Sequence, residues 1–114
     1  MEKEIKKMIE ENPIALATIS NEGKPHNIAV GDVKVVSDNQ ILIGDNYMKE
    51  TILNINNNKN VALLVFDSQQ GFELKGIAEY FKEGGWLEQV KMIHKGYPAK
   101  GAILVTINEI KECG

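Results

Sequence analysis

Short apolar runs rich in β-branched residues, separated by turn signals, limit most strongly how this chain can fold. Runs such as PIALATIS and VALLVFD are shorter than an ordinary helix and are bounded by polar turns such as NEGK. The pattern predicts six strands, at residues 13–20, 25–36, 41–44, 61–67, 71–81 and 100–112. Most of them are linked as hairpins, and parallel strands need longer crossovers, so a doubly wound parallel sheet is excluded.

Apolar residues at helical spacing predict three short helices, at residues 2–12, 48–56 and 83–96. The element order is therefore α-β-β-β-α-β-β-α-β. A chain of 114 residues has the length of one domain, which we expect to span residues 1–114. These elements predict a mainly β fold, a small antiparallel six-stranded β-barrel with short helices at its rim. Closing the barrel would remove the exposed sheet edges.

Charge and composition exclude several classes of partner. The formal net charge of −3 argues against nucleic acid, whose binders carry basic surfaces. No stretch approaches the roughly 18 apolar residues of a membrane span, and the N-terminal MEKEIKKMIEENP has no apolar core of a secretion signal. The single cysteine, Cys113, cannot form an internal disulfide. We therefore expect a cytoplasmic protein, without a membrane or nucleic-acid partner.

The stretch GDNYMKETILNI, residues 44–55, places a lysine and a threonine at the start of a helix directly after a strand. Free backbone N–H groups and the positive end of the helix dipole make a helix start suited to phosphate. Lys49 would add a charge there and Thr51 a hydroxyl donor. The alternative is an ordinary helix start, in which the two side chains serve solubility and capping.

Four segments in order give the chain a resemblance to a known family. They are IALATISNEGKPHNIAV, ILIGDNYMKETILNINNNKNVALLVFD, GFELKGIAEYF and YPAKGAILVTINEI, and together they cover nearly all of the sequence. The chain resembles the FMN-binding split-barrel proteins related to pyridoxamine 5'-phosphate oxidase, especially the small FMN-binding proteins. The resemblance implies a split barrel, FMN as cofactor, and a homodimer with FMN near the groove between subunits.

The resemblance also assigns site residues. In the family a Lys-Thr pair, followed by asparagine, holds the flavin phosphate, which corresponds here to Thr51 and Asn54. Glu50 stands at the usual lysine position and Lys49 one residue earlier. The remaining implied cofactor-binding residues are Ile28, Ala29, Val30, Gly31 and Asp32 along the second strand, Gly44, Asp45 and Asn46 at the end of the third, and Tyr97, Pro98 and Lys100 before the last. Gly31 would leave room for the flavin ring, or would mark a plain bulge.

Other residue types give no further site. The only histidines, His26 and His94, have no ligand spacing to acids or to Cys113, so we expect no metal. His26 is expected to face solvent, with a flavin contact as the alternative. No Ser-His-Asp or Cys-His set indicates nucleophilic catalysis, and the catalytic residues stay unassigned.

The sequence thus predicts an FMN-binding flavoprotein, with electron or hydride transfer as its reaction, because flavin chemistry belongs to the cofactor. Two alternatives stay open. One is a flavin-binding electron carrier that catalyses nothing by itself. The other is a split barrel that binds another ligand, such as a deazaflavin or haem, which the glutamate at position 50 favours.

Overall fold

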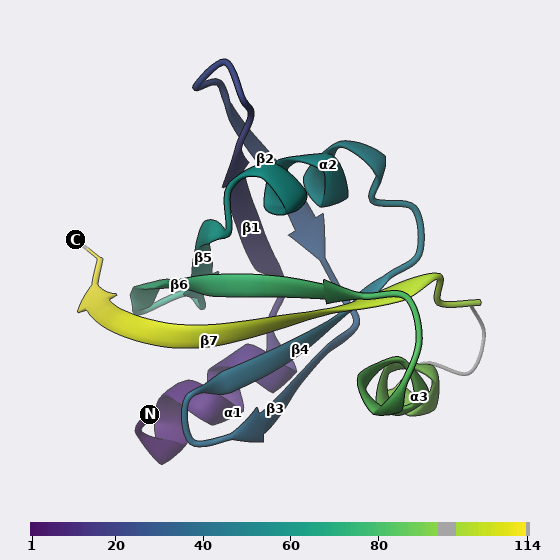
Figure 1. Ribbon diagram of the computed structural model, residues 1–114. Helices are drawn as coiled ribbons and strands as arrows, with labels where there is room; N and C mark the ends of the chain where they lie inside the picture. The colour runs from purple at the N-terminus through teal and green to yellow at the C-terminus, as the bar shows by residue number, and fades with distance from the viewer. Residues whose placement is uncertain (94–97, 114) are drawn as a thin grey trace.

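The computed structural model describes residues 1–93 and 98–113. Its elements are α1 (Lys3–Glu11), β1 (Ile14–Ile19), β2 (Pro25–Val30), β3 (Val33–Ser37), β4 (Gln40–Asp45), α2 (Lys49–Asn57), β5 (Asn60–Phe66), β6 (Gly71–Phe81), α3 (Gly85–Ile93) and β7 (Gly101–Glu112). All strand pairs are antiparallel, as predicted, and they form one sheet in the order β2-β1-β5-β6-β7-β4-β3 (Figure 1).

The described residues form seven strands, whereas six were predicted. The difference lies at residues 25–36, which were predicted to form a single strand. The ladder between β1 and β2 ends at the pair Ile14–Val30, because Pro13 precedes β1 and has no N–H to extend it. Beyond Val30 the chain crosses at Gly31 and Asp32 and pairs with β4 instead, starting at Val33 opposite Ile43. One predicted strand is therefore two, on opposite edges of the sheet.

Closure of the barrel was also predicted, and the sheet in the described residues is open. β2 and β3 form its two edges, with no ladder between them. The edge of β3 is instead covered by α1, where the Glu10 carboxylate accepts the Val35 N–H at 3.0 Å. A side chain thus satisfies a backbone group that a closing strand would have paired, and it protects that edge.

The main core lies on the inner face of the sheet, which α1 and α2 cover. Alternate residues of the strands point into it, among them Leu16, Ile43, Leu63, Leu74 and Val105, each with at most 1% of its surface exposed. α1 and α2 lie on opposite sides of the strands in Figure 1, and each inserts its apolar side into this core, including Ile9 and Ile55.

A second, smaller core lies on the outer face, under α3. Val90 of α3 packs with Leu42 of β4 and with Ala102 and Leu104 of β7. β7 is therefore buried on both faces over Ala102–Val105. None of the three helices, within the described residues, has the length and apolar character needed to cross a membrane.

Gly76 marks an irregularity in the pairing of β6 with β7. The register of β6 against β7 shifts between Lys75 and Gly76, which leaves Asn108 without a partner in the ladder. A Cβ at Gly76 would lie 2.3 Å from the Thr106 carbonyl oxygen. The two backbones therefore approach as closely as they do because residue 76 has no side chain.

Candidate functional site

A cleft of about 600 Å³ lies between β2, the Gly31–Asp32 link, the end of β4 and the start of α2. We call it the β2–α2 cleft. It brings together Ile28, Ala29, Val30, Gly31, Asp32, Gly44, Asn46, Lys49 and Thr51, all predicted from sequence, with His26, Tyr47, Met48 and Glu50. Its volume lies in the range of sites for small molecules and cofactors.

The wall formed by β2 is the free edge of this edge strand. Ile28, Ala29 and Val30 line the cleft along it, and Gly31 continues the wall where β2 ends. Ile28 and Val30 also pack in the main core, and Ala29 lies on the opposite face of the sheet. A Cβ at Gly31 would meet no atom within 4 Å. Packing within the subunit therefore does not require glycine at this position.

Asp32 and Gly44 fix the opposite wall. The Asp32 carbonyl accepts the Gly44 N–H at 2.9 Å, and its carboxylate accepts a hydrogen bond from the Asn46 amide at 2.9 Å. A Cβ at Gly44 would lie 3.0 Å from Val90 and 3.3 Å from Asp32. Glycine there lets α3 pack against β4 while β4 stays close to the link.

The turn from β4 into α2 is held by Asp45, which is 4% exposed and points away from the cleft. Its carboxylate accepts the Met48 N–H at 2.8 Å and the Tyr80 O–H at 2.6 Å. Its carbonyl accepts the Lys100 N–H at 2.8 Å. Asp45 thus ties the start of α2 to β6 and to the entry of β7.

Tyr80 is a donor in this arrangement. Burial raises the pKa of its hydroxyl above the usual range, and the hydrogen bond to the Asp45 carboxylate, with the repulsion of that charge, raises it further. Tyr80 therefore keeps its proton near neutral pH and donates it to Asp45.

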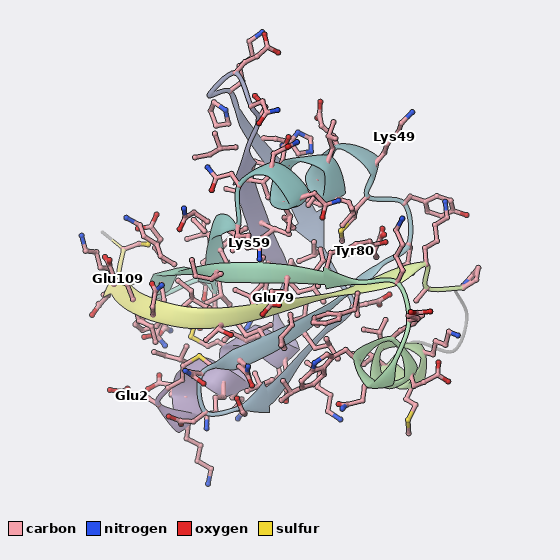
Figure 2. All side chains as sticks on the ribbon, viewed as in Figure 1. Glu2, Lys49, Lys59, Glu79, Tyr80 and Glu109 are labelled. Carbon is pink, nitrogen blue, oxygen red and sulfur yellow. The ribbon has the colours of Figure 1, made fainter. Side chains whose placement is uncertain are left out.

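The start of α2 presents polar groups to the cleft. Met48 makes no side-chain cap, and the first N–H groups of a helix have no partner within the helix. Thr51 lines the cleft although its residue is only 1% exposed, and Lys49 extends outward from the helix start (Figure 2). Backbone donors, a hydroxyl and an ammonium group are therefore within one small region.

A histidine–glutamate pair lies beside these groups. The His26 Nδ1 on β2 is 2.7 Å from a carboxylate oxygen of Glu50 on α2, and both residues line the cleft. His26 was expected to face solvent, with a flavin contact as the alternative, and it lines the cleft. Its contact with Glu50 was not predicted, and the one available signal was a glutamate at the position where the resemblance implies lysine.

Five other predicted residues lie elsewhere or outside the described chain. Asn54 is 3% exposed, and its amide donates to the Thr18 hydroxyl at 3.0 Å, so it ties α2 to β1 and does not line the cleft. Asp45 and Lys100 line a second cleft. Pro98 is exposed and lines neither cleft. Tyr97 lies outside the described residues. Within the described residues, no group of three or more His, Cys, Asp or Glu could hold a metal ion.

Comparison with known proteins gives the family. A family model described as pyridoxamine 5'-phosphate oxidase matches residues 1–113. An uncharacterised protein of Methanocaldococcus jannaschii is 34% identical over 115 residues, which cover 95% of this chain and 77% of that protein.

Three solved structures share the fold. HupZ from Group A Streptococcus has a TM-score of 0.91 at 22% identity, covering 98% of this chain and 93% of that one. An FMN-binding protein from Syntrophomonas wolfei has a TM-score of 0.86 at 15% identity, covering 96% and 83%. An F420 reductase has a TM-score of 0.73 at 19% identity, covering 93% and 94%. The family predicted from the four sequence segments is confirmed, and the chain belongs to the pyridoxamine 5'-phosphate oxidase family.

Proposed function

We propose that the β2–α2 cleft binds FMN and that the protein is a cytoplasmic flavoprotein of the oxidoreductase type. The observation that carries the proposal is the meeting of two surfaces in one cavity. The edge of β2 at Ile28, Ala29 and Val30 can lie along a flat ring, and the start of α2 can face a phosphate. Separate elements, 18 or more residues apart in sequence, supply them.

The phosphate end is supported by the donors at the start of α2. The N–H groups of Glu50 and Thr51, which have no partner within the helix, and the positive helix end favour an anion. Lys49 and Thr51 add a charge and a hydroxyl. Glu50 opposes an anion, but its carboxylate is held toward β2 by His26 at 2.7 Å. The residues present therefore fit a phosphate if this pair stays together.

Gly31 and strand β2 support the proposal that the flavin ring lies at the β2 side of the cleft. Open space at Gly31 allows a ring to approach the backbone where β2 ends. When bound, FMN supplies the transfer of one or two electrons. The part of the chain is to bind and orient the cofactor: β2 supplies a flat wall, Asp32 and Asn46 fix one side, and α2 anchors the phosphate.

The test is a comparison of FMN with riboflavin, which lacks the phosphate. Hydrogen bonds to charged groups contribute about 1.5–3 kcal/mol each, so we expect FMN to bind at least roughly tenfold more tightly. Fluorescence titration of the purified protein measures both affinities, and mass spectrometry of the molecule released on denaturation identifies the native ligand. Equal affinities would remove the start of α2 from the site. Absence of any phosphorylated flavin after expression with excess riboflavin would overturn the proposal.

Glu50 favours one alternative, a family member that binds a different ligand such as a deazaflavin or haem, because a carboxylate stands where the family has lysine. The absorption spectrum and the released mass separate these ligands from FMN. Whether an FMN-loaded protein is an enzyme or an electron carrier is decided by a substrate screen with reduced nicotinamide cofactors.

A homodimer, which the resemblance implies, belongs to the same proposal. The last strand is strongly apolar over Ala102–Ile107, but β7 is buried inside the subunit there. The outer face of β1, β5 and β6 is the better candidate. Ala15 pairs with Leu64 across this face, and Leu64, Phe66 and Ile77 are 37%, 52% and 38% exposed.

Pairing through this face would also complete the cleft. Ala29 of β2 lies opposite Ala15 in the ladder and lines the β2–α2 cleft. A second subunit seated on the face would therefore stand at the edge of the cleft and give it a further wall.

We expect light scattering at micromolar concentration to give twice the mass of one chain. Leu64→Glu should shift the protein toward monomer, because it places a charge in the proposed interface. Glu73→Gln, opposite Leu64 in the ladder, is the matched control and should leave the dimer intact. A monomer mass for the unmodified protein with flavin bound would contradict the proposal.

A further inference from the structure

A second cleft, of about 420 Å³, adjoins the β2–α2 cleft. Tyr47, Met48 and Lys49 line both cavities, so this short segment separates them. The far side of the segment is completed by Lys82 after β6 and Lys100 before β7. We call this cavity the lysine cleft. Three lysines from three different parts of the chain therefore converge on one hollow.

The positive charge of the lysine cleft is not neutralised by the described residues. None of the ion pairs among them includes Lys49, Lys82 or Lys100. The one carboxylate in the lining is Asp45, which accepts hydrogen bonds from Tyr80 and from the Met48 amide. Three lysines and one engaged carboxylate thus line this cavity, in a chain whose net charge is −3.

The rim of the lysine cleft holds one of these charges in position. Tyr47 is 80% exposed, and the Lys100 Nζ lies 5.2 Å from the centre of its ring. An ammonium group at this distance is attracted to the face of an aromatic ring. Lys100 is thereby held at the mouth of the cavity, where it can meet a ligand.

The cations of the lysine cleft are compact point charges. The sequence contains no arginine, so no planar guanidinium fork takes part. Lysine meets an anion as a point charge, and phosphate is an anion that proteins commonly bind in this way. We propose that the lysine cleft binds a phosphate-bearing small molecule, at a site separate from the phosphate end of the β2–α2 cleft. The proposal does not depend on FMN occupying that neighbouring cleft.

Inorganic pyrophosphate is the probe, titrated into the full chain by calorimetry and followed by amide shifts in NMR spectra. We expect one equivalent to bind, with the largest shifts at Lys82, Lys100 and Tyr80. Lys82→Met and Lys100→Met should each weaken binding about tenfold, because each removes one charge-assisted contact. Lys59→Met is the matched control, since Lys59 is exposed between α2 and β5 and is not part of the lysine cleft (Figure 2).

Three results would overturn the proposal. Pyrophosphate could fail to bind, or Lys82→Met and Lys100→Met could bind it as Lys59→Met does. FMN could displace pyrophosphate from the protein, which would assign the lysines to the flavin's own phosphate. Citrate could bind as tightly as pyrophosphate and with the same lysine dependence, which would make the site a general anion site. Failure of FMN to bind, with pyrophosphate still bound, would overturn the proposed function and leave this inference standing.

Discussion

Gly76→Ala is expected to destabilise the protein far more than the same methyl group added at Gly31 or Gly85. The new Cβ would lie 2.3 Å from the Thr106 carbonyl oxygen and 3.2 Å from the Ile107 Cα. Both atoms belong to the backbone of β7, which is buried on both faces nearby, so neither can rotate aside. Forcing β6 and β7 apart should lower the free energy of unfolding by about 3 kcal/mol or more. At this chain length that lowers Tm by roughly 10 °C or more.

The two matched controls receive their methyl group in open space. A Cβ at Gly85 or Gly31 would meet no atom within 4 Å. Gly85→Ala, at the start of α3, should leave stability unchanged or raise it by up to about 1 kcal/mol, since alanine is the better helix former. Gly31→Ala should leave Tm unchanged but weaken FMN binding, because Gly31 lines the β2–α2 cleft. Calorimetric melting measures the stabilities, and an unchanged Tm for Gly76→Ala would mean that the strands separate at little cost.

The position of Gly76 illustrates what the sequence could predict. A glycine inside an apolar strand pattern has few explanations, and close backbone approach is one of them, so the irregularity at Lys75 and Gly76 was visible in advance. Strand positions were predictable for the same reason, because alternation and turn residues are local signals. The β4–α2 connection likewise followed from GDN directly after an apolar run.

The features that the sequence could not predict depend on contacts between residues that are far apart in the chain. Residues 25–36 read as one strand because both halves are apolar, and the change of partner at Gly31 and Asp32 is set by where β1 ends. The same holds for Asn54. Its spacing from Thr51 matched the family pattern, yet its amide is bonded to Thr18, 36 residues away. The contact between His26 and Glu50 could not be predicted from the local sequence either, since the two residues are 24 positions apart.

Glu50→Lys should tighten FMN binding by roughly 10- to 100-fold, since charge-assisted hydrogen bonds contribute about 1.5–3 kcal/mol. The change removes a negative charge from the start of α2 and places a positive one there, restoring the family's Lys-Thr pair with Thr51. The lost contact with His26 matters little for folding, because the Glu50 side chain is 66% exposed. FMN titration at two salt concentrations measures the effect, and the gain should shrink at high salt.

Companion variants separate the contributions at this helix start. Glu50→Gln removes the negative charge alone and should give a smaller gain. Glu109→Lys makes the same charge change at a distant exposed position and should leave FMN affinity unchanged (Figure 2). Thr51→Val keeps the shape and removes the hydroxyl, and Lys49→Met keeps the stem and removes the charge. Each of these two substitutions should weaken the binding of FMN.

The pattern of these results decides which side chain meets the phosphate. Lys49 lines both the β2–α2 cleft and the lysine cleft, so its side chain has two anion sites within reach. If Glu50→Lys tightens FMN while Lys49→Met leaves FMN binding unchanged and weakens pyrophosphate, then Lys49 serves the lysine cleft, and Glu50 alone marks the place of the family's lysine. If Lys49→Met weakens FMN, then the lysine reaches the flavin phosphate from one position earlier in the helix. If neither change nor Thr51→Val alters FMN affinity, the start of α2 is not a phosphate site, and the pair of His26 and Glu50 only closes the surface between β2 and α2.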